Sequence, residues 1–147
     1  MQMHNNLTSS PIRITIFDDD VASVITEQSV LASEGSSARS FSFTLVLGSQ
    51  PTTSVALVPQ VDTSDVLIAD ATILFYPSTW NVAQTVRCMV IDDEIDEGDV
   101  EIRPIFHAVS SADSMYDNIT VAAIDVYIRD NDVSPLPEGF HIVGVAV

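Results

Sequence analysis

Two β-prone runs and an acidic loop make up residues 73–99, ILFYPSTWNVAQTVRCMVIDDEIDEGD. The first run ends at Tyr76-Pro77-Ser78, a turn signal. The second, TVRCMVI (85–91), is rich in the apolar and β-branched residues that strands favour. A strand, a turn, a second strand and a polar loop within so few residues predict antiparallel pairing.

Similar runs extend in both directions from this stretch. In SFSFTLVL (40–47) every second residue is apolar, and in PIRITIF (11–17) Ile12, Ile14 and Ile16 share one face. Further β-prone runs cover residues 54–61, 71–77, 100–109 and 120–128. The sequence therefore predicts an all-β, antiparallel sandwich of about seven to nine strands, with extended N- and C-terminal strands.

Residues 21–35, VASVITEQSVLASEG, fit two interpretations. Val21, Val24, Ile25 and Leu31 recur at roughly helical spacing, whereas the many Val and Thr residues favour a bent edge strand. We favour the strand.

The composition restricts the partners that this chain can have. Among 147 residues there are 21 acidic and five basic ones, which gives a net charge of −16. Nucleic acid and anionic membranes would be repelled, whereas cations would be attracted. No apolar run approaches the ~20 residues of a membrane span, so membrane insertion is not expected.

The acidic residues cluster where predicted strands end. Asp18-Asp19-Asp20 follows PIRITIF, the loop 92–99 follows TVRCMVI, and Asp130-Asn131-Asp132 follows TVAAIDVYI. ITIF-DDD-VA near the N-terminus and VYIR-DND-VS near the C-terminus form a partial internal repeat. We therefore expect residues 1–20 to be an N-terminal extension that carries the last strand of a preceding repeat. Residues 21–132 would form the sandwich, and 133–147 a proline-containing linker with an apolar tail.

Three motifs resemble the Calx-β repeat of exchangers, integrin β4 and large surface proteins. They are the Glu34-Gly35 turn before SFSFTLVL, the stretch 73–99 with its L-x-F-x-P and acidic segments, and the Asp113-x-x-Tyr116 turn before the closing strand. The resemblance covers about residues 24–132 and implies an immunoglobulin-like sandwich at the cell surface or outside the cell. A departure is Glu97-Gly98-Asp99-Val100-Glu101, where many members have a second Glu followed by Thr.

The resemblance also implies a Ca²⁺ site at one pole of the sandwich. Carboxylate oxygens are the ligands that Ca²⁺ prefers, and a cation relieves the repulsion between clustered acids. The implied ligands are Glu34, Asp92, Asp93, Glu97, Asp130 and Asp132. An acidic rim that is merely solvated is the alternative.

Motifs of catalysis are not recognisable in the sequence. The chain has no G-x-S-x-G, no H-E-x-x-H and no glycine-rich phosphate loop, and its three histidines are scattered. His107 is expected to be a strand residue, and Cys88 a buried, inert thiol. We therefore expect no enzymatic activity.

The two ends of the chain suggest assembly with copies of itself. The apolar tail FHIVGVAV (140–147) would be unfavourable in water, and strand addition to a neighbouring copy would cover it. Repeated head-to-tail addition would give an extracellular filament. The expected contact residues are Ile12, Ile14, Ile16, Phe140, Ile142, Val143, Val145 and Val147. Folding of both ends onto their own sandwich is the structural alternative, and a calcium-binding adhesion or receptor module is the functional one.

Two features bear on secretion. The first residues, MQMHNNLTSS, lack the pattern of a signal peptide, so we expect that a signal was removed or that the numbering begins inside a precursor. The sequons at Asn6 and Asn118 could carry glycans in a secreted eukaryotic protein.

Overall fold

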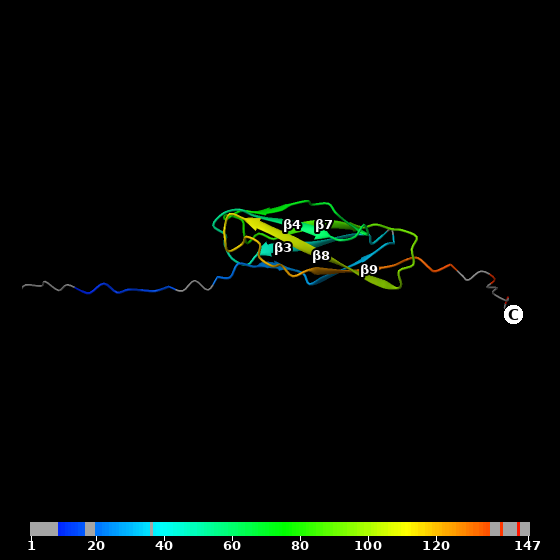
Figure 1. Cartoon of the computed structure of the whole chain (residues 1–147), viewed down its shortest axis with the longest axis horizontal. Helices are drawn as coiled ribbons and strands as arrows, with labels where there is room; N and C mark the ends of the chain where they lie inside the picture. Colours follow the sequence, from blue (N-terminus) through cyan, green and yellow to red (C-terminus); the bar gives the residue numbers. More distant parts are fainter. Residues whose placement is uncertain (1–8, 17–19, 36, 136–138, 140–143, 145–147) are drawn as a thin grey trace, which may run out of the picture.

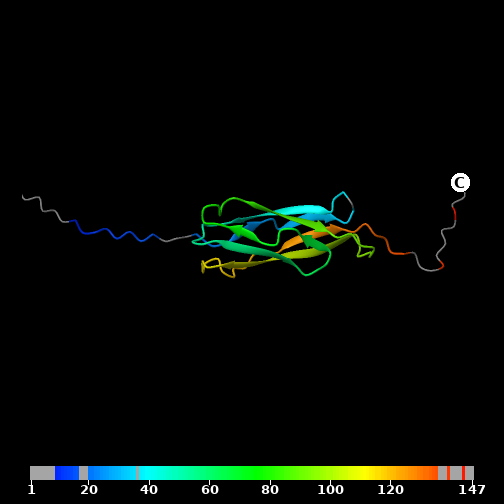
Figure 2. The ribbon, with the colours of Figure 1, turned by 90° about the horizontal axis from the view of Figure 1, so that it is seen from above.

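The computed structural model describes residues 9–16, 20–35, 37–135, 139 and 144. These residues contain nine strands in two sheets that pack face to face (Figures 1 and 2). This part of the chain has no helix long and apolar enough to cross a membrane. The predicted all-β sandwich is confirmed.

The first sheet has four strands, all paired in the antiparallel sense. Their spatial order is β1-β3-β7-β5. The bounds are β1 (Val24–Thr26), β3 (Ser40–Leu47), β7 (Gln84–Val90) and β5 (Val66–Ile68).

The second sheet has five strands in the order β2-β9-β8-β4-β6. The bounds are β2 (Ser29–Ser33), β9 (Ile124–Arg129), β8 (Val100–Ser111), β4 (Val55–Val61) and β6 (Ile73–Phe75). β9 pairs antiparallel with β8 but parallel with β2, a pairing that an antiparallel sandwich did not predict.

The core lies between the sheets and follows the alternation of the sequence. Phe43, Leu45 and Leu47 of β3 face inward and are buried, whereas Thr44 and the two serines of this strand, at the alternate positions, are exposed. Ile124 and Val126 of β9 are buried in the same way from the opposite sheet. Because apolar side chains occur at every second position, each sheet packs one face against the core and exposes the other.

Residues 21–35 form a bent strand, not a helix. The chain runs along the first sheet as β1, crosses at Glu27 and Gln28, and continues along the second sheet as β2. Glu27 fixes the crossing, because its carboxylate accepts hydrogen bonds from the Thr44 amide (2.8 Å) and hydroxyl (3.0 Å). Because the chain keeps its direction across the gap, β2 meets β9 running the same way.

Two of the strand predictions differ from the structure. PIRITIF was expected to be a strand, yet residues 11–16 belong to no strand, because none of the described residues lies beside them to supply hydrogen-bond partners. β5 was not predicted, because three residues between turn signals give too short a pattern to recognise.

Tyr116 closes the end of the sandwich from which the N-terminal segment leaves. Its buried hydroxyl donates to the Ser49 carbonyl oxygen (2.6 Å) and accepts from the Ser49 amide (3.1 Å). Asp113 holds the same turn by accepting from the amides of Thr52 (2.8 Å) and Met115 (2.9 Å). The Asp-x-x-Tyr motif is therefore a turn that ties the loop before β9 to the end of β3. Trp80 is partly buried and packs against the core.

Candidate cation site

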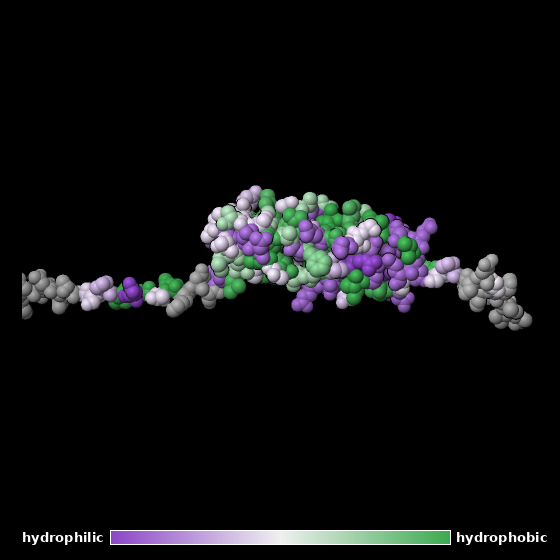
Figure 3. All heavy atoms as spheres, viewed as in Figure 1, coloured by the Kyte–Doolittle hydropathy of each residue, from purple (hydrophilic) through white to green (hydrophobic). Residues whose placement is uncertain are grey.

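Acidic side chains gather at the end of the sandwich where β2 and β9 finish and β8 begins. Glu34 follows β2, Asp130 and Asp132 follow β9, and Glu97 and Glu101 flank the start of β8. In Figure 3 this end of the body, next to the departing C-terminal segment, is predominantly hydrophilic. The three elements that meet there are adjacent in one sheet, which is why residues far apart in sequence converge.

Glu34 lies at the centre of this cluster and is only 1% exposed. Its amide donates to the Arg129 carbonyl oxygen (3.1 Å), which extends the β2·β9 ladder by one residue and fixes the side chain against β9. Its Oε2 atom has no hydrogen-bond partner among the described residues. Burial, and then the charges of Asp130, Asp93, Asp132 and Glu97, raise the pKa of Glu34 to about 7.

Asp130 holds the loops of the cluster together. Its Oδ2 atom accepts from the Glu97 amide and its Oδ1 atom from the Asp132 amide, both at 2.7 Å. The Asp132 Oδ2 atom is buried and lacks a hydrogen-bond partner in the described part of the chain. Burial and the nearby Asp130 charge raise the pKa of Asp132 above its ordinary value.

Arg103 neutralises the side of the cluster next to β8. Its Nε atom lies 2.6 Å from Asp65 Oδ2, and its Nη2 atom lies 3.1 Å from Glu97 Oε1 and 2.5 Å from Glu101 Oε2. Glu101 is 7% exposed. Burial and the adjacent Glu97 raise its pKa to about 7 against the opposing effect of Arg103. One arginine therefore forms salt bridges with three carboxylates.

The distances define two sets of carboxylates that could hold one ion. In each set, one oxygen from every member lies within 4.8 Å of the others. The first set is Glu34, Asp130 and Asp132, and the second is Glu34, Glu97 and Glu101. Glu34 belongs to both sets. An all-oxygen donor set suits a hard cation such as Ca²⁺ rather than a soft transition metal.

The six ligands that the resemblance implies lie at different places in this cluster. Four of them, Glu34, Glu97, Asp130 and Asp132, belong to the two sets. Asp92 instead pairs with Arg39 (3.3 Å), and Asp93 accepts from the Ile95 amide (2.8 Å) within its own loop. Asp93 acts on the cluster through its charge, which contributes to the raised pKa of Glu34.

Glu101 and Arg103 belong to the cluster but were not among the residues predicted from the sequence. Glu101 stands at a buried position of β8, between exposed Val100 and Ile102. An acidic residue in the inward phase of an apolar strand was the available signal. Arg103 is the next residue in that phase, and a buried acid with an arginine two positions away predicts a paired site.

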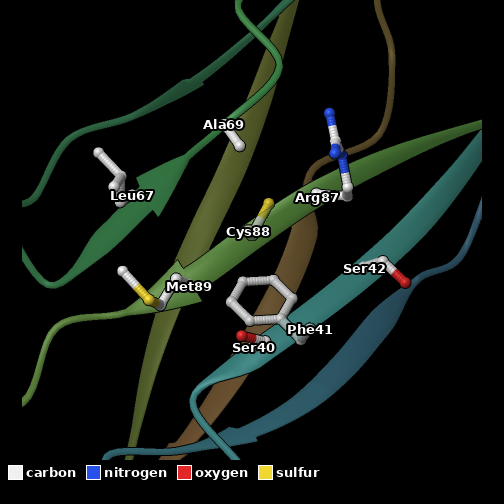
Figure 4. A pocket seen from close by; sticks show the side chains of 8 residues that line it. All are labelled: Ser40, Phe41, Ser42, Leu67, Ala69, Arg87, Cys88 and Met89. Carbon is white, nitrogen blue, oxygen red and sulfur yellow. The ribbon is translucent and has the colours of Figure 1, made fainter.

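A separate hollow of about 460 Å³ is lined by residues of β3, β5 and β7 (Figure 4). Arg87 at its margin is bound to Asp70 by two contacts (2.9 and 3.3 Å). Burial raises the pKa of the Cys88 thiol to about 12, so the thiol stays protonated at neutral pH. Cys88 is thus a structural residue, and His107 lies edge-on to Phe43 in the core-facing row of β8.

The predicted subunit contacts lie partly within the described residues. Ile12, Ile14 and Ile16 are 86%, 77% and 86% exposed, on a segment that runs away from the sandwich (Figure 1). The predicted contacts in the C-terminal tail lie outside the described residues, and so does Asn6. These contacts are Phe140, Ile142, Val143, Val145 and Val147. Asn118 is exposed in the turn after Tyr116, with φ of 58°.

No family model matches the chain, and neither does any curated protein. Solved structures do resemble it. The PapD-like domain 7 of human CEP192 is 8% identical with a TM-score of 0.55, and the match covers 88% of this chain and 99% of that one. The apo-form Calx CBD1 domain is 16% identical with a TM-score of 0.50, over 74% of this chain and 98% of the other.

A third similar structure is that of the Salmonella enterica SafA pilin in complex with the SafB chaperone. It is 10% identical with a TM-score of 0.55, and the match covers 80% of this chain and 59% of that chain. At such low identities the likeness concerns the fold alone. The Calx-type and PapD-like domains share one architecture with this chain, and that architecture is an immunoglobulin-like β-sandwich.

Proposed function

We propose that this chain is a calcium-binding structural module of an extracellular or cell-surface assembly, of the Calx-β type. The observation that carries the proposal is the buried Glu34 carboxylate, whose Oε2 atom has no partner among the described residues. An ionised carboxylate in such a place is unfavourable unless a cation or a proton compensates it. The Calx-like motifs of residues 24–132 and the likeness in fold to the Calx CBD1 domain support the same function.

The proposed ion binds between Glu34, Asp130 and Asp132, with Glu97 as a further ligand. The unpartnered Oδ2 atom of Asp132 and Oε2 atom of Glu34 supply oxygens that no other described group uses. Asp92 and Asp93 form the outer part of the site. Their current partners, Arg39 and the Ile95 amide, would compete with the ion.

A calorimetric titration of the full chain with Ca²⁺ tests this function. We expect saturable binding and a rise in melting temperature, since ligand at ~100 times its dissociation constant adds about 2.7 kcal/mol of stability. Glu34→Gln should abolish most of the binding. Asp125→Asn removes the same charge near the opposite end of β9 and should leave it intact. An unchanged melting temperature of the wild-type chain in millimolar Ca²⁺ and in chelator would refute the calcium site.

The second candidate function is that of a filament subunit that polymerises head-to-tail by strand addition. The specific observation in its favour is the exposed row of Ile12, Ile14 and Ile16, at the end opposite to the one where the chain leaves β9 (Figure 1). Contacts at two opposite ends propagate without closing. The apolar tail residues are the proposed contacts at the other end.

Light scattering and negative-stain imaging of the full chain test assembly. We expect oligomers whose mass grows with concentration, and dissociation when Ile12, Ile14 and Ile16 are all replaced by serine. Replacing the exposed Leu67, Leu74 and Met115 by serine is a control that removes three exposed apolar side chains from the sandwich itself. A monomer at every concentration would contradict the filament.

A further inference from the structure

The exposed N-terminal segment repeats the sequence pattern of β9. When Asp18-Asp19-Asp20 is aligned with Asp130-Asn131-Asp132, residues 12–16 (IRITI) fall on residues 124–128 (IDVYI). Three apolar positions then coincide: Ile12 with Ile124, Ile14 with Val126, and Ile16 with Ile128. The positions between them are polar or amphipathic in both segments.

These two segments have opposite environments. In β9 the three apolar side chains are 0% exposed and form part of the core. The three isoleucines of the N-terminal segment are at least 77% exposed, and no backbone hydrogen bond joins residues 9–16 to another described residue. A pattern that is buried in full at one place in this chain is therefore presented without a partner at another.

The neighbours of β9 define what such a segment fits. β9 lies between two strands, β2 on its parallel side and β8 on its antiparallel side, with five and six paired residues respectively. Its inward side chains at alternate positions fill the core beneath. A slot of this kind satisfies both backbone edges of an inserted strand and buries its three apolar side chains. The edge strands β1, β5 and β6 are three residues long and the edge strand β2 is five, and each of them could form hydrogen bonds with only one side of an added strand.

We propose that residues 11–16 are the closing strand of a second sandwich of this same type, one whose β9 position is vacant. The segment enters between the β2-like and β8-like strands of that partner, parallel to the first, with Ile12, Ile14 and Ile16 in the places of Ile124, Val126 and Ile128. This inference is an alternative to the self-assembly proposed above, because it gives the N-terminal segment a partner other than a complete copy of this chain, and it does not depend on calcium. A complete copy of this chain is not that partner in its ground state, because its own β9 fills the slot.

A graft within the full chain tests whether the two segments are interchangeable. The triple variant Asp125→Arg, Val126→Ile and Tyr127→Thr gives positions 124–128 of β9 the sequence of residues 12–16, IRITI. One extra buried methylene is the main strain, so we expect a cooperative fold with a melting temperature lowered by no more than about 10 °C.

In the matched control, positions 124–128 carry the sequence of residues 13–17 (RITIF). The grafted sequence is then shifted by one residue relative to the strand. This slip turns the apolar face outward, and the chain should not fold. If the in-register graft also fails to fold, the proposal is wrong.

A peptide experiment tests insertion directly. Val126→Asn weakens β9 in the full chain, and a labelled synthetic peptide of residues 9–20 is then added. We expect saturable binding to this variant with a rise in its melting temperature, and no binding to the wild-type chain. The same peptide with Ile14→Asn should bind at least ~10-fold more weakly, because a polar amide would enter the core.

Equal binding of the peptide to wild type and variant would place it on an edge or a face and would overturn the proposal. If Val126→Asn does not fold by itself, refolding in the presence of the peptide replaces the titration, and no recovery of the fold overturns it. A monomeric wild-type chain refutes the filament but leaves the grafted strand and the peptide to decide the partner.

Discussion

The Glu34 carboxylate lies among other acids in a place closed to water, so its protonation and the stability of the fold are linked. Burial and four neighbouring charges raise its pKa from the ordinary value of 4.5 to about 7. An acid with a raised pKa binds its proton more tightly in the folded chain than in the unfolded one. Its contribution to stability is therefore full below about pH 4.5 and is lost as the pH rises towards 7.

The calcium-free chain should become less stable between about pH 5 and 7.5. Glu34 alone accounts for at most about 3 kcal/mol of this loss, and Glu101, whose pKa is also raised to about 7, adds to it. Thermal unfolding in chelator at a series of pH values measures the effect. Glu34→Gln should flatten the dependence, and saturating Ca²⁺ should do the same by holding the carboxylate ionised. A wild-type chain whose stability rises over this interval would contradict the buried acid.

Tyr116 should be the most sensitive polar residue at the opposite end of the sandwich. Tyr116→Phe removes the hydroxyl that donates to the Ser49 carbonyl and leaves the buried Ser49 amide without its acceptor. We expect a loss of about 1–3 kcal/mol of unfolding free energy, measured by chemical denaturation. Tyr76→Phe, at an exposed tyrosine, is the control and should change the free energy by less than about 0.5 kcal/mol. Equal effects of the two changes would contradict the role of the turn.

At the scale of elements, alternation made most strands predictable. SFSFTLVL was expected as a strand and is one over its full length, because Phe43, Leu45 and Leu47 need a core on one side only. The parallel pairing of β2 with β9 could not be predicted in this way, since it depends on which sheet each half of a bent strand joins. Residues 11–16 have the same alternation as β9, but no strand of the described part of the chain lies beside them, so a pattern gives the potential to pair and not the partner.

The crossing between β1 and β2 should depend on Glu27. Glu27→Ala removes the acceptor of the Thr44 amide and hydroxyl and should cost about 1 kcal/mol, with faster hydrogen exchange at the Thr44 amide. Gln28→Ala shortens the adjacent exposed side chain without removing the acceptor of Thr44. This control should leave the exchange rate of the Thr44 amide unchanged. Protection at Thr44 that survives Glu27→Ala would show that the ladder alone fixes the bend.

At the scale of the whole molecule, the net charge of −16 opposes compaction. The repulsion between like charges is strongest at the end of the sandwich where the acids are concentrated. In chelator, raising NaCl from about 0.05 to 0.5 M should increase the melting temperature, because screening acts over about a Debye length. In saturating Ca²⁺ the increase should be smaller, because the ion has already neutralised part of the cluster. A melting temperature that is independent of salt in chelator would mean that the other interactions outweigh this repulsion.

The sequence predicted the region of the site better than its chemistry. The acidic residues of loop 92–99 and of segment 130–132, each at the end of a predicted strand, indicated which loops converge, since the ends of neighbouring strands meet. Whether Asp92 faces the other acids of the cluster or Arg39 depends on side-chain positions that spacing does not encode. Glu101 was not predicted because it lies inside a strand, whereas the predicted ligands were sought where strands end.

The parallel pair β2·β9 also determines how the module carries load. The chain enters at one end through β1 and β2 and leaves at the other through β9 (Figures 1 and 2). Tension between the ends therefore pulls two parallel neighbours in opposite directions along their length. The hydrogen bonds between them are sheared together instead of being opened one after another, so a module in series within a stretched assembly would act as a mechanical clamp.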